Sequence, residues 1–196
     1  MLKEVKPEIR IVGFDDAPFT FNDKETLIIG AVCRAGLQLD GVITTKIDVD
    51  GLDVTEKIIK LLKNSKHFEQ LRVIMLDGIT FGGFNIVDIE KLFKKTKLPV
   101  IVVIREMPDL DLIKKSLKRF KDFKKRWTIM KKAGEINEII IKNKVLKTPK
   151  KLYYQFIGVD KKIAEKIIKM TALHSATPEP VRIAHLIGEG LKSKSI

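Results

Sequence analysis

The chain has 196 residues, of which 44% are apolar and 32% are charged, values typical of a folded protein with one sizeable core. We therefore expect a single domain over residues 1–196. No apolar run approaches the roughly 18 residues that cross a bilayer, and no signal-peptide core follows the N-terminal charges, so we expect a cytoplasmic protein. The only cysteine, Cys33, excludes an internal disulfide or a cysteine-based zinc site.

The charge balance is strongly positive, since 38 Lys and Arg against 25 Asp and Glu give +13. This excess favours a polyanionic partner, although Lys-rich surfaces also mark proteins from hot environments. Ten basic residues and one acid fall between Lys114 and Lys132, where apolar residues recur at helical spacing. We call this stretch the basic ridge. We expect its Lys118, Lys121 and Lys125 to contact nucleic-acid phosphates; the alternative is a solvated helix face.

Along the chain, Val- and Ile-rich runs at residues 9–14, 26–34 and 39–47 predict three strands joined by turns. Helical spacing then predicts a helix near 54–62 and another over about 85–95, the second one capped by Asn85. Apolar runs at 71–76 and 99–104 predict two more strands, and a glycine-rich loop spans 78–83. The basic ridge predicts a helix over 110–132. Strands at 136–141 and 152–156 and helices at 160–170 and 181–191 complete the chain.

This order of elements is that of the ribonuclease H-like fold. We predict an α/β protein with a ribonuclease H-like mixed five-stranded sheet, flanked by helices and followed by a C-terminal α/β extension. In that fold the first three strands are antiparallel, and the later ones enter parallel through right-handed crossovers. The ends of the first and fourth strands then lie side by side.

Aspartates close both of these strands: Asp15 and Asp16 follow the first, and Asp77 follows the fourth. Such folds place ligands in the crevice beyond the carboxyl ends of parallel strands. Two close carboxylates repel and raise each other's pKa, and a divalent cation relieves that repulsion. We therefore predict that Asp15, Asp16 and Asp77 bind Mg²⁺ or Mn²⁺. The alternative is that each aspartate only caps a turn.

Several segments resemble an archaeal family of uncharacterised proteins, the domain of unknown function numbered ninety-nine, of the UPF0215 type. They are GFDDAPF, VDGLDVT, VIMLDGITFGGFN, LPVIVVIRE and PEPVRIAHLI, and the resemblance covers nearly the whole chain. That family looks like a distant relative of endonuclease V, a ribonuclease H-like nuclease that cuts strands near deaminated adenine with Mg²⁺. The resemblance therefore implies a nuclease-like protein that acts on nucleic acid.

The resemblance also implies a set of site residues. Asp15 and Asp77 match the aspartates that close the first and fourth strands of endonuclease V. Where that enzyme has a glutamate after the third strand, this chain offers Asp50 or Asp53. The histidine of a late His-Arg pair is missing at its matching position, and His185, one helical turn further on, is the candidate replacement.

Other side chains are open to two interpretations. Arg182 is expected to bind a phosphate or to form a structural ion pair with Glu179 or with a strand-end aspartate. Trp127 is a candidate for stacking on a base or for the core. Phe81 and Phe84, which flank the glycine-rich loop, are expected either to stack on a base or to be buried.

The leading hypothesis is metal-dependent hydrolysis of DNA or RNA phosphodiesters. In it, Asp15 and Asp77 hold the metal and Asp50 or Asp53 completes the ligand set. The carboxylates of Asp15 and Asp77 should then lie within about 4 to 7 Å of each other. One alternative is a nucleic-acid-binding module of the same fold without cleavage. The other is a protein-interaction module, in which the basic ridge is only solvated.

Overall fold

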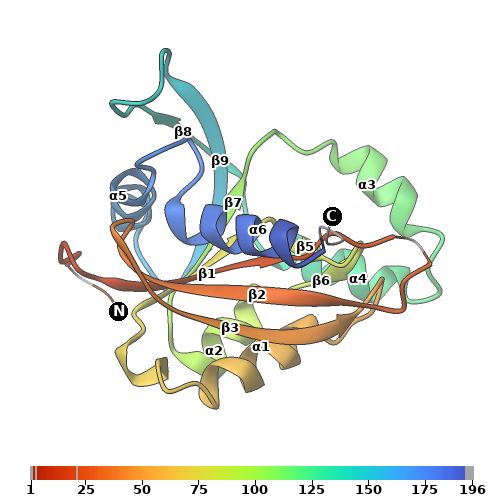
Figure 1. Ribbon diagram of the computed structural model, residues 1–196. Helices are drawn as coiled ribbons and strands as arrows, with labels where there is room; N and C mark the ends of the chain where they lie inside the picture. The colour runs from red at the N-terminus through yellow and green to blue at the C-terminus, as the bar shows by residue number, and fades with distance from the viewer. Residues whose placement is uncertain (1, 3, 21, 193–196) are drawn as a thin grey trace.

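The computed structural model describes residues 2, 4–20 and 22–192, and its centre is a seven-stranded sheet with helices on both faces (Figure 1). The strands lie in the order β3-β2-β1-β4-β7-β9-β8. Their bounds are β1 Arg10–Asp16, β2 Glu25–Arg34, β3 Gln38–Asp48, β4 Val73–Asp77, β7 Val100–Ile104, β8 Asn137–Ile141 and β9 Lys150–Ile157. The helices are α1 Val54–Lys63, α2 Ile89–Thr96, α3 Leu110–Leu117, α4 Phe123–Lys132, α5 Lys161–Thr171 and α6 Glu179–Lys192, with a 3-10 turn at Phe68–Gln70. Among the described residues no helix is both long enough and apolar enough to cross a membrane.

The strand pairing confirms the predicted ribonuclease H-like fold. β2 runs antiparallel to both β1 and β3, whereas β1, β4 and β7 are parallel. Phe14 of β1 pairs with Leu76 of β4, so the residues that follow them, Asp15 and Asp77, reach the same edge of the sheet. β9 pairs antiparallel with β7 and β8 with β9, which extends the predicted five strands to seven.

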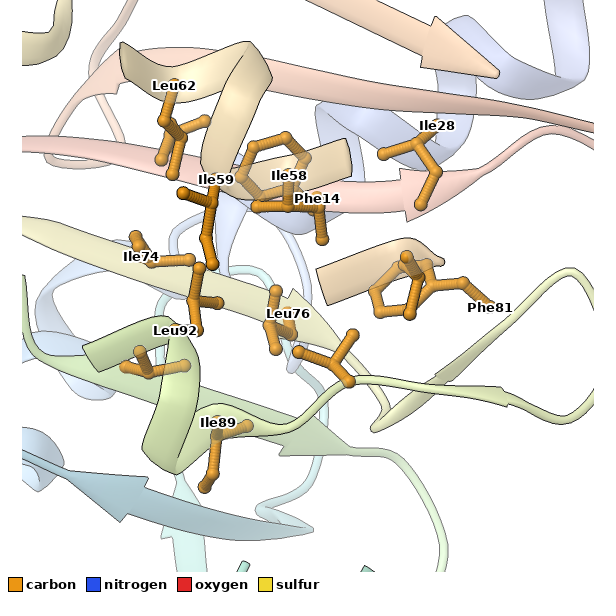
Figure 2. Close-up of a cluster of buried hydrophobic side chains, with 14 of the residues drawn as sticks. Phe14, Ile28, Ile58, Ile59, Leu62, Ile74, Leu76, Phe81, Ile89 and Leu92 are labelled. Atoms are coloured by element: carbon orange, nitrogen blue, oxygen red, sulfur yellow. The ribbon is translucent and has the colours of Figure 1, made fainter. Parts of the chain in front are cut away.

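The central strands are buried on both faces, which explains why their sequences are almost continuously apolar. In β4, Ile74 and Leu76 belong to one apolar cluster, and Val73 and Met75 to the other. Figure 2 shows the first cluster, where side chains of α1 and α2 meet those of β1, β2 and β4. The second cluster joins α5 and the first turn of α6 to the opposite face. The ends of the central strands are therefore held on a rigid frame.

The glycine-rich loop differs from the prediction. Its residues form a short hairpin, β5 Thr80–Phe81 and β6 Asn85–Ile86, so the second helix starts at Ile89 rather than near residue 85. Asp88 caps this helix, because its side chain accepts the backbone N–H of Lys91 at 2.8 Å. The prediction that Asn85 caps this helix is wrong. Asn85 is fully buried, its Oδ1 accepts the backbone N–H of Val54 at the start of α1, and its Nδ2 donates to the Asp48 carbonyl oxygen and the Asp53 carboxylate. A tertiary contact thus overrides its local preference for a helix start.

The basic ridge forms two helices instead of the single predicted one. α3 ends at Leu117, and residues 118–122 turn before α4 begins. Leu117 and Phe120 join an apolar cluster with Met130 of α4, and the turn lets both helices contribute to it. Figure 1 shows α3 standing away from the sheet, with α4 nearer to β6.

α6 crosses β1 at Gly13. A Cβ at this position would overlap the backbone of Pro180, in the first turn of α6. Such a close approach of two backbones requires glycine. Gly13 therefore sets how near α6 lies to β1, and with it the position of the α6 side chains that face the end of the strand.

We expect Gly13→Ala to lower the free energy of unfolding by about 1–3 kcal/mol or more, because the added methyl forces the helix and strand apart. Urea denaturation followed by circular dichroism measures the loss. Gly190→Ala, also in α6, is the control: its Cβ would meet no heavy atom within 4 Å. It should be neutral or stabilising by about 0.4–1 kcal/mol. Equal stabilities of the two variants would contradict the tight crossing.

Candidate metal centre and nucleic-acid interface

Two carboxylates and one imidazole meet at the edge of the sheet. Asp15 comes from the end of β1, Asp77 from the end of β4 and His185 from α6. One ligand atom of each residue lies within 4.8 Å of the other two. The expected proximity of Asp15 and Asp77 is confirmed. We call these three side chains the candidate metal centre.

His185 reaches this centre because α6 lies close over β1. Its Nδ1 is 2.8 Å from Oδ2 of Asp15, a hydrogen-bond distance. Arg182, one turn earlier, is directed elsewhere. Its Nε donates to the buried Glu179 carboxylate at 3.0 and 3.1 Å, and its Nη2 donates at 2.6 Å. The structural ion pair considered for Arg182 is thus present, and the candidate replacement histidine lies beside the first aspartate.

Ionisation of the Asp15 carboxyl group is unfavourable at this buried position beside two other acids. Only 6% of the residue is exposed. Burial, with the negative charges of Asp77 and Asp16, raises the pKa of the Asp15 carboxyl from 3.8 to about 7, against the hydrogen bond from His185. A cation between Asp15 and Asp77 would remove this penalty. A strongly shifted carboxyl in a cleft is also what functional sites commonly show.

Asp16 is directed to the glycine-rich loop. Its Oδ2 accepts the backbone N–H of Gly82 at 2.7 Å, and burial raises the pKa of its carboxyl. It lines the same cleft as Asp15 but does not belong to the candidate metal centre. Asp16 therefore ties the end of β1 to the loop that follows β4.

Asp50 and Asp53 lie in the turn before α1, and the structure does not bring them into the candidate metal centre. Oδ1 of Asp50 accepts the backbone N–H of Phe84 at 2.8 Å, and its Oδ2 lies 3.3 Å from the Arg119 guanidinium. Oδ1 of Asp53 accepts from the side-chain amide of Asn85 at 2.6 Å. The third donor beside the two strand-end aspartates is an imidazole rather than either of these acids.

Sequence analysis misses Arg126, which holds this turn in place. It belongs to the basic ridge by sequence, yet it is only 4% exposed. Its guanidinium donates to the carbonyl oxygens of Asp50, Gly51 and Phe84 at 2.8, 2.9 and 2.6 Å, and to the Asp122 carboxylate at 2.7 Å. No local pattern separates it from its exposed basic neighbours, because the three carbonyl groups that hold it buried lie 42 to 76 positions away in the sequence.

Arg105 is a second residue that sequence analysis misses. It follows β7 and forms an ion pair with Asp77. With Asp15, Asp77, His185 and Glu189 it lines an open cleft of about 440 Å³. Its side chain is 48% exposed, so it can exchange partners at the rim of the cleft. The rule that singled out the aspartates, applied to the third parallel strand, would have found it.

The lysines selected from the basic ridge all face solvent. Lys118 follows α3, Lys121 lies in the turn between the helices and Lys125 lies on α4, and each is exposed. Their exposure fits both phosphate contact and simple solvation. The ridge is smaller than its sequence indicates, because Arg126 is buried and Arg119 faces Asp50.

The strand order and pairing define a ribonuclease H-like fold, which the chain shares with endonuclease V. The chain belongs to the Endonuclease dU family, whose model matches residues 7–192. A UPF0215 protein of Methanosarcina mazei is 51% identical over 187 residues, covering 95% of this chain and 92% of that protein. A UPF0215 protein of Thermococcus sibiricus is 45% identical over 198 residues, covering 98% and 97%. The family resemblance seen in the sequence is confirmed.

Solved structures agree with this assignment. A protein of unknown function from Archaeoglobus fulgidus has a TM-score of 0.82 and 35% identity, covering 95% of this chain and 99% of that one. Endonuclease V of Ciona intestinalis, in complex with a 24mer DNA that contains an inosine followed by a ribo-adenosine, has a TM-score of 0.60. It is 18% identical and covers 90% of this chain and 82% of its own, a likeness that shows the shared fold.

The raised pKa of Asp15 predicts a pH-dependent stability. Since the folded state holds the proton up to about pH 7 and the unfolded chain loses it near 3.8, stability should fall as pH rises between these values. Without divalent cations, the wild type should lose up to about 4 kcal/mol relative to Asp15→Asn from pH 4 to pH 7.5. Urea denaturation of both proteins at several pH values measures the difference. A constant difference would contradict the shifted pKa.

Proposed function

We propose that this chain hydrolyses phosphodiester bonds of DNA or RNA with a divalent cation. The observation that carries the proposal is the meeting of Asp15, Asp77 and His185 within 4.8 Å at the edge of the sheet. Carboxylate oxygens suit Mg²⁺, and carboxylates with an imidazole suit Mn²⁺. The description of the family as Endonuclease dU supports the same class of reaction.

Each residue of the cleft has a role in this proposal. Asp15 and Asp77 hold the cation, and His185 fixes the Asp15 carboxylate through its hydrogen bond or acts as the third donor. When bound, the cation activates water and stabilises the leaving oxygen. Arg105 exchanges the Asp77 carboxylate for a phosphate oxygen of the strand, because a planar guanidinium matches the geometry of phosphate.

For Asp16, Asp50 and Asp53 we propose supporting roles. Each accepts hydrogen bonds from the hairpin that follows β4. Together they fix this hairpin against the end of β1 and against the turn before α1. Hydrogen bonds within the fold already engage these three carboxylates, so in this proposal Asp15 and Asp77 are the aspartates that bind the metal.

We propose that the exposed lysines of the basic ridge bind the phosphate backbone. The net charge of +13 favours a polyanionic partner, and an exposed lysine next to a phosphate releases condensed counterions. Such contacts are independent of base sequence. They supply affinity and register, while the cleft supplies the chemistry.

Mn²⁺ should raise the melting temperature of the wild type, because it binds the folded state at the crowded carboxylates. At a hundredfold excess over the dissociation constant the gain is about 2.7 kcal/mol, or roughly 5–10 °C. Asp77→Asn should abolish the rise, and Asp50→Asn should keep it. Differential scanning calorimetry with and without the metal measures both. An unchanged response in Asp77→Asn would mean that the metal binds elsewhere.

Cleavage is tested with end-labelled oligonucleotides that contain deoxyuridine, incubated with Mn²⁺ or Mg²⁺ and resolved on denaturing gels. We expect metal-dependent strand cleavage, and a loss of at least about 100-fold in rate for Asp77→Asn. His185→Ala should also cleave more slowly. Tight binding without cleavage under any metal condition would show instead that the chain is a nucleic-acid-binding module.

The basic ridge is tested by replacing Lys118, Lys121 and Lys125 with Gln. Binding to oligonucleotides should weaken regardless of sequence, and the slope of log affinity against log salt should flatten by roughly 0.7 to 0.9 per lost contact. Stability should change by only about 0.5 kcal/mol, since these positions are exposed. A matched triple variant on α5, with Lys162, Lys166 and Lys169 changed to Gln, removes the same charge elsewhere. Equal salt slopes for the two variants would favour the solvated face and the protein-interaction module.

A further inference from the structure

A cluster of basic side chains lies at the end of the sheet opposite the candidate metal centre. Arg10 is the first residue of β1, and Asp15 lies five residues further along the strand, about 16 Å away at about 3.3 Å per residue. The cluster surrounds a cavity of about 260 Å³, whose lining residues are Arg10, Arg34, Asp40, Lys66, His67 and Gln70. The cleft has a different set of lining residues. The basic cluster is therefore separate from the candidate metal centre.

The pairing of β1 with β2 sets two arginines opposite each other. Arg10 pairs with Arg34, and like charges in such a cross-strand pair repel. Asp40 of β3 lies at a β-bulge, where the register with β2 shifts between Val32 and Cys33. Bulges redirect individual side chains. This one brings the Asp40 carboxylate to both guanidinium groups and offsets part of their repulsion.

Both arginines bind the Asp40 carboxylate through Nε. Nε of Arg10 donates to Oδ2 at 2.9 Å, and Nε of Arg34 donates to Oδ2 at 2.9 Å and to Oδ1 at 3.1 Å. Within the described part of the chain, no hydrogen bond engages the Nη atoms of either arginine. The two side chains are 30% and 36% exposed. Their terminal N–H groups can therefore donate to a second anion from solvent.

Lys66 and His67 complete the cluster from the segment that follows α1. Lys66 is exposed and lines the cavity beside the arginines. The imidazole of His67 lies against the backbone of Gly41, where an added Cβ would be only 2.6 Å from its Nε2. The missing side chain of Gly41 thus makes room for the ring. Three segments of the chain, around residues 10, 34–41 and 66–70, build this cavity.

The charges around the cavity do not balance. Hydrogen bonds from Arg34 and Arg10 hold the pKa of the Asp40 carboxyl below its usual range, so Asp40 is ionised at neutral pH. It offsets one of the three cations formed by the two arginines and Lys66, which leaves two positive charges. Glu8, whose charge also acts on Arg34, is not among the lining residues. The cavity is therefore suited to an anion with two negative charges.

We propose that this cluster binds the terminal phosphate group of a phosphate monoester. A monoester carries about 1.5 to 2 negative charges at pH 7, and its three terminal oxygens accept hydrogen bonds from planar guanidinium groups. A phosphodiester inside a nucleic-acid strand matches less well, because it carries one charge and two of its oxygens are substituted. The ligand is thus a free nucleotide or the phosphorylated end of a strand, which share this group. The site does not depend on the proposed hydrolysis at the cleft.

The test uses two small probes, methyl phosphate and dimethyl phosphate, which represent a terminal and a backbone phosphate. Each is titrated into the full chain with EDTA at constant pH and ionic strength, and NMR follows the histidine ring signals. The chain has three histidines, and His67→Gln identifies the signal of His67. We expect methyl phosphate to shift this signal and to bind at least about tenfold more tightly than dimethyl phosphate.

Lys66→Gln should weaken methyl phosphate binding about threefold or more, because it removes a cation that takes no part in the Asp40 ion pairs. Lys63→Gln, exposed at the end of α1 and outside the cavity, is the matched control and should keep the affinity. Arg105→Gln, which removes the guanidinium of the cleft, should also keep it. Equal binding of the two probes, an unmoved His67 signal or an unchanged affinity in Lys66→Gln would overturn the proposal. Loss of binding in Arg105→Gln would do the same, since the phosphate would then lie in the cleft.

Two further pairs of ligands distinguish the sources of the phosphate. One is a nucleoside 5′-monophosphate against its nucleoside, and the other is a 5′-phosphorylated oligonucleotide against the same strand without the phosphate. Tighter binding of the phosphorylated member in the first pair assigns a free nucleotide, and in the second pair alone it assigns a strand end. No preference in either pair would overturn the proposal. Because no divalent cation is present, a failure of the proposed hydrolysis would leave these results unchanged.

Discussion

The site depends on the parallel pairing of β1 with β4. This pairing, with Phe14 opposite Leu76, brings Asp15 and Asp77 to one edge of the sheet although they are 62 positions apart in the sequence. The bare backbone of Gly13 lets α6 approach β1 closely enough to place His185 against Asp15. A shift of one residue in the register would turn one carboxylate to the opposite face of the sheet.

The same pairing creates an electrostatic problem. Asp15 is nearly buried, Asp77 and Asp16 are nearby acids, and together they raise the pKa of the Asp15 carboxyl to about 7. The protein does not neutralise this cluster fully, since Asp77 pairs with the half-exposed Arg105 at the rim. This repulsion between buried carboxylates is explained if a cation and a phosphate normally occupy the cleft. The cation would offset the charges of Asp15 and Asp77, and the phosphate would bind the Arg105 guanidinium.

Sequence analysis predicts the central sheet well because buried parallel strands have continuous apolar runs and their ends follow a simple rule. The order of the elements predicts the fold, and the rule that ligands lie beyond the carboxyl ends of parallel strands selects Asp15 and Asp77. Applied to β7, the same rule would also have selected Arg105. Asp50 and Asp53 could not be placed, because the turn that holds them is organised by Arg126 and Asn85 through contacts distant in sequence. The predicted start of the second helix is wrong for a similar reason. Asn85 is a residue type that often caps helices, but here it is buried and hydrogen-bonds to Asp53 instead.

The central claim is that one divalent cation binds between Asp15, near the end of β1, and Asp77, at the end of β4. Crystals soaked in Mn²⁺ and measured near the manganese absorption edge test it directly through the anomalous difference map. The account predicts a peak within bonding distance of the carboxylates of Asp15 and Asp77, with His185 beside it. A map with no peak there, or with the only strong peak at another group of residues, would contradict it.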